Sequence, residues 1–154
     1  MRFLLIDKIT DWQPGQEATA IKNVSLTEDF FDDHFPMKPI MPGVLVLEGM
    51  AQLAGLLLEA GVREESGRNI KALMSMIEKA KFRRPARPGD SLEYHVEVIS
   101  VNELGGSVRT HASLKGERIA ESNLIYSFHE FDNPLLEERQ NRLLKLWKQG
   151  LPER

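Results

Sequence analysis

The feature that most constrains this chain is a long apolar stretch over residues 43–60, which three polar side chains interrupt: Glu48, Gln52 and Glu59. At helical spacing these three fall on or near one stripe, and Leu, Val, Met and Ala fill the other faces. The length approaches that of a membrane span, but charged residues within spans are costly. The pattern therefore predicts the buried helix of a soluble domain, ended by Gly61.

Strand-like segments flank this helix on both sides. Two are expected before it, at residues 2–9 and 17–25, with a turn at 13–15. Apolar and polar residues alternate with period two from Leu92 to Val98, which indicates a half-buried strand. The other strands expected after the helix are at 70–82, 107–114 and 118–128, with Gly105-Gly106 as a hairpin turn and 62–69 as a charged loop. An apolar helix needs a sheet around it, so we predict an α+β domain with a mainly antiparallel sheet.

A last helix is predicted at residues 134–149, with Asn133 as its cap and Pro134 at the first helical position. Its apolar residues Leu136, Leu143, Leu144 and Trp147 can share one face. We accordingly divide the chain into a domain of residues 1–132 and a C-terminal helical extension of residues 133–154.

Composition narrows the function classes. The 154 residues suit one domain, and a net charge of -3 argues against a broad nucleic-acid-binding surface. The absence of cysteine excludes disulfides, thiolate zinc sites and a cysteine nucleophile, and is compatible with the cytoplasm. No convincing metal cluster occurs in the sequence, since His95, His111 and His129 are expected on the surface.

The segment before the helix carries the candidate chemistry. His34 is followed by three prolines at intervals of three, which would hold the segment rigidly. Gly43 stands at the helix start, where a backbone N–H at the positive end of the helix dipole could bind a developing oxyanion. Glu48, in apolar surroundings, suits a general acid. Such a set fits proton abstraction next to a carbonyl, with loss or addition of water.

Each of these residues also has a structural interpretation. A single histidine beside a phenylalanine is often structural, and the Glu48 stripe could simply reach solvent or a neighbouring subunit. Gly43 could be an ordinary helix start. The residues by themselves leave these alternatives open and do not name a substrate.

The run from His34 to Gln52 resembles the hotdog-fold β-hydroxyacyl-acyl carrier protein dehydratases of bacterial fatty acid synthesis. The shared residues are His-Phe-Pro, then Pro-Ile-Met-Pro-Gly, then Glu-x-Met-Ala-Gln, and the step from His34 to Glu48 matches the family. The segment from Lys81 to Asp90 is similar to the family's strand and turn before the later strands. The resemblance covers about residues 1–130 and implies a long helix wrapped by an antiparallel sheet.

The resemblance also implies roles. His34 and Glu48 would be a catalytic dyad contributed by different subunits of a homodimer, and many family members assemble further into trimers of dimers. Gly43 would polarise the thioester carbonyl, Gln52 would support the carboxylate, and the acyl chain would lie in an apolar tunnel at the interface. The implied reaction converts (3R)-hydroxyacyl-acyl carrier protein to the trans-2-enoyl thioester without a metal or redox cofactor. Glu48, rather than Asp, favours dehydration without isomerisation.

Three positions depart from the family pattern. Met37 stands where Gly usually follows His-Phe-Pro, Gly49 stands where Ala is commoner, and the helix after residue 133 lies past the usual end. Two rival functions therefore remain open. One is a hotdog acyl thioesterase, and the other is an acyl-thioester-binding protein without catalysis.

A basic cluster suggests where a carrier protein would dock. It comprises Lys79, Lys81, Arg83, Arg84 and Arg87, in an otherwise acidic chain. Because acyl carrier proteins are acidic, charge complementarity would favour this surface. The alternative is a solvated charged edge that discourages strand pairing.

Overall fold

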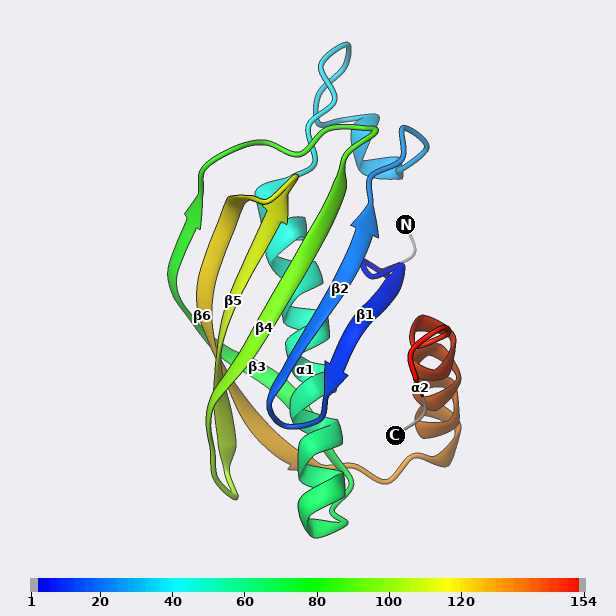
Figure 1. Cartoon of the computed structure of the whole chain (residues 1–154), viewed down its shortest axis with the longest axis vertical. Coiled ribbons are helices and arrows are strands. Elements are labelled where there is room, and N and C mark those ends of the chain that lie inside the picture. Colours follow the sequence, from blue (N-terminus) through cyan, green and yellow to red (C-terminus); the bar gives the residue numbers. More distant parts are fainter. Residues whose placement is uncertain (1–2, 153–154) are drawn as a thin grey trace.

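The computed structural model describes residues 3–152 and shows one six-stranded antiparallel sheet around a long helix (Figure 1). The strands follow one another across the sheet in the order β1-β2-β4-β5-β6-β3. The elements are β1 (Lys8–Gln13), β2 (Glu17–Asn23), the short 3-10 helix η1 (Asp29–Phe31), α1 (Gly43–Ser66), β3 (Ile70–Phe82), β4 (Ser91–Val101), β5 (Gly105–Leu114), β6 (Glu117–Glu130) and α2 (Pro134–Trp147). The predicted α+β architecture is confirmed.

Helix α1 is the centre of the core. Met50, Leu53 and Leu57 have no exposed surface, and each such side chain contributes about 1.5–3 kcal/mol by burial. The helix contacts strands β2 to β6. It is also the one described helix that is long and apolar enough to cross a membrane, but its buried face belongs to the core of this domain.

The sheet meets α1 through alternate residues. In β4, Leu92, Tyr94 and Val96 are fully buried, while Glu93 and Glu97 are exposed on the outer face. This is the period-two pattern that the sequence predicts, and antiparallel pairing with β2 and β5 places the strand in the middle of the sheet.

The predicted end of the central helix is wrong. Helix α1 continues past Gly61 to Ser66, and Gly67, with a φ of 70°, is its C-terminal cap. Gly61 serves a different purpose, because a Cβ there would lie 2.5 Å from the Cα of Gly15 in the β1–β2 turn. The glycine permits close packing of turn against helix, a contact that local sequence signals do not reveal.

Two other predicted boundaries are wrong. The first strand is Lys8–Gln13 rather than 2–9, and the buried apolar residues Leu5 and Ile6 lie before it in a segment without regular secondary structure. Gly105 and Gly106 begin β5 instead of forming the turn, which lies at residues 102–104. A Cβ on Gly105 would lie 2.2 Å from the carbonyl oxygen of Tyr126, so close strand packing requires the glycine.

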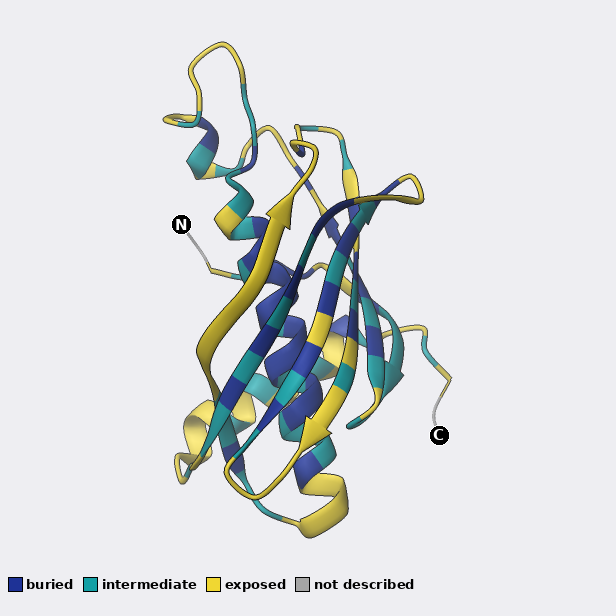
Figure 2. Cartoon of the chain, turned by 90° about the vertical axis from the view of Figure 1, so that its left-hand side faces the viewer, coloured by how far each residue is buried: buried dark blue, intermediate teal, exposed yellow. Residues whose placement is uncertain are grey.

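Strand β3 forms one edge of the sheet and is exposed over most of its length (Figure 2). After Ile70, which is buried, its large apolar side chains are between 39% and 51% exposed: Leu73, Met74, Met76, Ile77 and Phe82. A long, apolar, unpaired edge is a template for pairing with another chain. The single chain thus leaves a surface suited to a partner.

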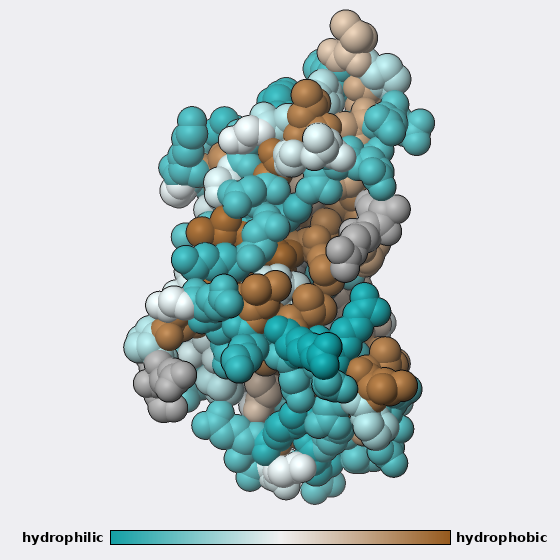
Figure 3. All heavy atoms as spheres, turned by 90° about the vertical axis from the view of Figure 1, so that its right-hand side faces the viewer, coloured by the Kyte–Doolittle hydropathy of each residue, from teal (hydrophilic) through white to brown (hydrophobic). Residues whose placement is uncertain are grey.

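Helix α2 lies beside the sheet, near β1 and the lower part of α1 (Figure 1). Asn133 caps it as predicted, since its side chain accepts a hydrogen bond from the Leu136 N–H at 3.2 Å. Trp147 is buried in the common core, and Leu143 and Leu144 pack against that core. Hydrophobic side chains gather across the middle of the face that carries α2, while its lower third is mainly hydrophilic (Figure 3).

Candidate active site

The His34 ring is held at a defined place before α1. Its Nδ1 lies 2.7 Å from the carbonyl oxygen of Ile40, and its backbone bonds to Phe30 O and Ile40 N at 3.1 and 3.0 Å. The ring of Phe35 stacks on it at 4.0 Å between centroids. Because a carbonyl can only accept, Nδ1 must carry the proton, which leaves Nε2 of the neutral imidazole as a base.

Met37 occupies the tip of the loop. The segment from Phe35 to Lys38 closes a turn through two backbone hydrogen bonds, of 3.0 and 3.2 Å. Met37 has a φ of 64°, and its side chain is fully exposed. Glycine adopts such a φ more readily, so the residue carries a small conformational cost of about 1 kcal/mol. Among the described residues the Met37 side chain thus points to solvent.

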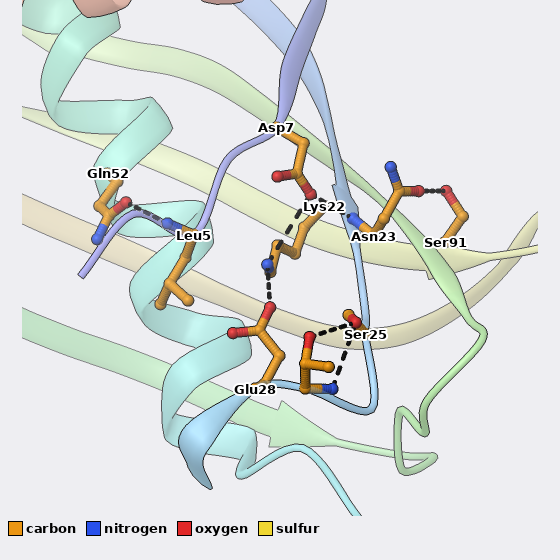
Figure 4. A network of polar contacts seen from close by, with 9 residues as sticks. Leu5, Asp7, Lys22, Asn23, Ser25, Glu28, Gln52 and Ser91 are labelled. Atoms are coloured by element: carbon orange, nitrogen blue, oxygen red, sulfur yellow. Dashed lines mark hydrogen bonds and ion pairs between the residues drawn. The ribbon is translucent and has the colours of Figure 1, made fainter. Parts of the chain in front are cut away.

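A buried ion pair anchors the segment that leads into this loop (Figure 4). Lys22 is 4% exposed, and its Nζ lies 2.5 Å from Oε1 of Glu28 and 3.9 Å from Oδ2 of Asp7. Glu28 immediately precedes η1, which carries the Phe30 carbonyl that binds His34. Sequence reasoning missed this anchor, because its two halves are a strand lysine and a loop glutamate that look like surface charges.

Glu48 lies in the second turn of α1, with Gln52 one turn further on. Gln52 donates from Nε2 to Glu48 Oε1 at 3.2 Å and to the carbonyl of Phe3 at 3.0 Å, and its Oε1 accepts the Leu5 N–H at 3.1 Å. The contact with Leu5 is drawn in Figure 4. These bonds fix which end of the amide faces the carboxylate. Gln52 thus positions Glu48 through Oε1. The second carboxylate oxygen, Oε2, remains available to further donors.

Gly43 is the first residue of α1. The N–H groups of Leu45 and Val46 donate to the carbonyl of Pro42, whereas the Gly43 N–H precedes the first position that can bond within the helix. A Cβ on Gly43 would lie 2.9 Å from the ring of Phe82, so a side chain there would displace that ring. The glycine therefore combines a free donor at the positive end of the helix with a close approach.

Gly49, the neighbour of Glu48, has a packing reason. A Cβ there would lie 2.2 Å from the hydroxyl oxygen of Tyr94. That hydroxyl is buried, and among the described residues it has no hydrogen-bond partner. Burial raises the pKa of the Tyr94 phenol, and the charges of Asp7 and Glu28 raise it further. The departure from Ala at this position thus makes room for a large strand residue.

A groove of about 540 Å³ begins at Glu48 and runs along α1. Its apolar lining includes Ala51 and Gly55 of α1, Leu73 and Met74 of β3, and Leu136, Leu143 and Trp147 of α2. Tyr126 forms part of the wall and donates its hydroxyl to the carbonyl of Ala51 at 2.7 Å. Burial raises the pKa of Tyr126, and Glu48 and Glu59 add to this shift.

Glu59 lines the same groove, but both of its carboxylate oxygens are already occupied by donors. Its side chain is 10% exposed, and Oε1 accepts the Ala72 N–H at 3.0 Å and lies 3.2 Å from Lys71 Nζ. Gln140 of α2 donates to Oε2 of Glu59 and accepts from Lys71 Nζ at 2.8 Å. The sequence shows Glu59 on the stripe of Glu48, but its partners come from distant segments.

In a single chain His34 and Glu48 remain separate. No hydrogen bond or ion pair joins them within residues 3–152, and His34 bonds instead to residues of its own loop. Within the described residues the candidate base and the candidate carboxylate therefore make no direct polar contact.

The basic cluster is divided by the structure. Arg83 lies 2.8 Å from Glu121 and Arg84 is paired with Glu117, whereas no ion pair in the described part of the chain involves Lys81 or Arg87. Hydrogen bonds from Arg83 and Arg118 lower the pKa of Glu121. Internal pairs therefore neutralise part of the expected docking surface.

Two of the three remaining histidines face each other on the outer side of the sheet. His95 of β4 is opposite His111 of β5, and their rings stack at 4.9 Å between centroids. Burial lowers the pKa of His111, and so do Arg118 and His95, while Glu121 opposes them. Both rings are half-buried, whereas His129 is exposed as expected. Among the described residues, no group of three potential metal ligands comes together.

Comparison with known proteins places the chain in a family. A family model described as a FabA-like domain matches residues 1–129. The 3-hydroxyacyl-acyl-carrier-protein dehydratase FabZ of Shewanella pealeana is 40% identical over 128 residues, which cover 83% of this chain and 84% of that protein. The dehydratase FabZ of a Nitratiruptor species is 43% identical over 125 residues, with 79% and 84% covered.

Solved structures support the fold. The dehydratase heterocomplex ApeI:P of Xenorhabdus doucetiae matches with a TM-score of 0.66 at 15% identity, over 90% of each chain. A hypothetical thioesterase of Streptococcus pneumoniae, solved with coenzyme A, matches with a TM-score of 0.62 at 8% identity, over 82% of this chain and 88% of that one. At such identities the likeness concerns the fold alone, which dehydratases and thioesterases share.

Proposed function

Because this chain belongs to the FabA-like family, we propose that it dehydrates (3R)-hydroxyacyl-acyl carrier protein to the trans-2-enoyl thioester in fatty acid biosynthesis. The observation that carries the proposal is the placement of His34, whose Nδ1 is committed to the Ile40 carbonyl and whose Nε2 has no hydrogen-bond partner within residues 3–152. A base with one fixed tautomer suits abstraction of a proton next to a thioester carbonyl.

The reaction follows from three groups. His34 Nε2 removes the C2 proton, while the Gly43 N–H at the helix start stabilises the negative charge on the thioester oxygen. Glu48, held by Gln52, protonates the hydroxyl at C3, which leaves as water as the C2–C3 double bond forms. After the product leaves, His34 releases the C2 proton to solvent and Glu48 takes one proton from solvent, which restores the neutral imidazole and the carboxylic acid. Each residue acts through its own side chain or backbone, without a metal or redox cofactor.

The active site in this proposal is shared by two subunits. His34 and Glu48 are not joined within one chain, and the long apolar edge strand β3 is exposed. Pairing of two β3 edges would cover these side chains and bring each His34 toward the partner's α1. We therefore infer a homodimer with two composite sites, and a hexamer is a further assembly of the same unit.

Docking of the acyl carrier protein belongs to the same proposal. Lys81 and Arg87 have no ion-pair partner in the described part of the chain and stand near the paired residues Arg83 and Arg84. An acidic carrier can bind all four, since Arg83 and Arg84 can exchange their internal partners for carrier carboxylates. The substrate, delivered on a soluble carrier, is consistent with a cytoplasmic enzyme whose domain is 1–132 and whose extension is 133–154.

The test is hydration of crotonyl-acyl carrier protein, the reverse reaction, followed by loss of enoyl-thioester absorbance. We expect the wild type to hydrate it and His34→Ala to lose about 10²–10⁴-fold in rate. An intact thioester across chain lengths would instead indicate an acyl-binding protein, and release of free thiol would indicate a thioesterase.

A further inference from the structure

We propose that α2 forms one wall of the acyl-chain groove and that its Gln140, with Glu59 and Lys71, closes the far end and sets the longest acyl chain that fits. This inference rests on the proposed function, because it names the determinant of substrate length at that site. The family match ends at residue 129 and α2 begins at Pro134, so the wall is a feature of this chain beyond the matched family domain.

The groove connects the catalytic carboxylate with α2. Glu48 and Gln52 line it at one end, and Leu136, Leu143 and Trp147 of α2 line its side. An alkyl chain attached to a thioester at Glu48 would therefore find apolar surface contributed by α2. Burial of one methylene group in this groove contributes ~0.8 kcal/mol, which raises the binding affinity about fourfold.

The far end of the groove is polar and firmly held. Glu59, Lys71 and Gln140 bond to one another there, and the backbone N–H of Ala72 also bonds to Glu59. A methyl group pushed against this cluster gains little, because it would have to displace polar groups from their partners. The cluster thus acts as a stop for the chain.

The spacing of Glu48 and Glu59 along α1 determines how long an acyl chain can be before it reaches the stop. Glu48 and Glu59 are eleven residues apart on one helix, about 16 Å along its axis. A staggered alkyl chain advances about 1.3 Å per methylene, so about twelve carbons beyond C3 span that distance. A decenoyl chain falls short of the stop, whereas a hexadecenoyl chain reaches it.

The experiment compares hydration of crotonyl, trans-2-decenoyl and trans-2-hexadecenoyl groups on acyl carrier protein by the full-length enzyme. Gln140→Leu makes the stop less polar while Glu59 keeps Lys71 and Ala72. We expect its ratio of kcat/KM for hexadecenoyl to that for crotonyl to rise about tenfold. Leu136→Trp adds bulk to the wall, and the same ratio should fall about tenfold.

Two matched controls lie on the same helix outside the groove. Asn141→Leu and Leu135→Trp make comparable substitutions at exposed neighbouring positions, and their ratios should stay within about twofold of wild type. Groove variants whose ratios match those of the controls would overturn the proposal. If the wild type hydrates none of the three thioesters, the proposed function fails. In that case equilibrium binding of the same carriers to wild type and variants decides the inference, with the same chain-length shifts expected.

Discussion

Two carboxylates on one stripe of α1, Glu48 and Glu59, have opposite surroundings. Among the described residues Glu48 has one side-chain donor, the Gln52 amide at 3.2 Å, and it is half-buried in the lining of the groove. Glu59 is 10% exposed and is bound by a backbone N–H and an ammonium from β3 and by an amide from α2. A carboxylate with free bonding capacity can act on a substrate, whereas a saturated one holds segments together. The same residue type on the same face thus serves catalysis at one end and structure at the other.

The largest expected effect is the loss of activity when Glu48, the carboxylate assigned to catalysis, is replaced. Glu48→Gln keeps the size of the side chain but removes the acidic proton, so hydration of crotonyl-acyl carrier protein should fall by about 10²–10⁴-fold. Steady-state kinetics check this, with Glu65→Gln as a control at an exposed position of the same helix. Near-normal turnover in Glu48→Gln would remove Glu48 from the reaction.

The next effect concerns the backbone beside Glu48. Gly49→Ala should lower the free energy of unfolding by about 1–3 kcal/mol, because the new Cβ would meet the Tyr94 hydroxyl at 2.2 Å. Helix propensity alone predicts the opposite sign, a gain of about 1 kcal/mol. Urea unfolding distinguishes the two.

Gly55→Ala is the matched control for this effect. Its Cβ would lie 3.8 Å from Tyr126, an ordinary contact, so it should stabilise the helix by up to about 1 kcal/mol. Equal shifts at both glycines would mean that Tyr94 does not constrain Gly49.

A somewhat smaller effect tests the structural end. Glu59→Gln loses the charge that Lys71 faces and weakens the two hydrogen bonds from Ala72 and Gln140, so the free energy of unfolding should fall by about 1–2 kcal/mol. Glu48→Gln should change it by less than about 0.5 kcal/mol. The comparison fails if urea unfolding ranks the two variants in the reverse order.

The smallest effect concerns His111, which lies away from both carboxylates and makes the free energy of unfolding depend on pH. Burial, Arg118 and His95 lower the pKa of folded His111 below its ordinary value of about 6.5, so the unfolded chain binds more protons near that pH. Stability should therefore fall as pH drops below about 6.5 and be fully recovered above it. His111→Gln should flatten this slope in unfolding curves measured from pH 5 to 8, and an unchanged slope would exclude His111 as its source.

Local patterns predict much of this fold. Alternation marks Leu92 to Val98, three prolines mark the loop before α1, and Asn133-Pro134 marks the start of α2. Each signal acts over a few residues, so the sequence contains all that is needed to interpret it.

The errors arise where one residue serves a distant contact. The sequence signal at Gly61 predicts a helix end, but this glycine packs against Gly15. The signal at Gly105 predicts a turn, but this glycine lies close to the carbonyl oxygen of Tyr126. The partners of Glu59 likewise come from β3 and α2. Local rules cannot predict such contacts, because they depend on how remote segments pack.

In the candidate site, too, local sequence patterns identify the residues, whereas contacts between distant segments determine their orientation. Sequence identifies His34, Gly43, Glu48 and Gln52 as candidates, and the structure shows how Ile40 orients His34 and how Gln52 orients Glu48. The dyad itself is not assembled within one chain, so no single-chain pattern could reveal its geometry.

The most direct test of the shared site mixes two inactive subunits. His34→Ala and Glu48→Gln proteins are each measured alone and after joint unfolding and refolding in equal amounts. A composite site gives each mixed dimer one intact His34–Glu48 pair, so hydration of crotonyl-acyl carrier protein should return to about a quarter of the wild-type rate. Mixtures that stay as inactive as the separate variants, although the subunits have exchanged, would contradict the assignment of His34 and Glu48 to one site shared between two chains.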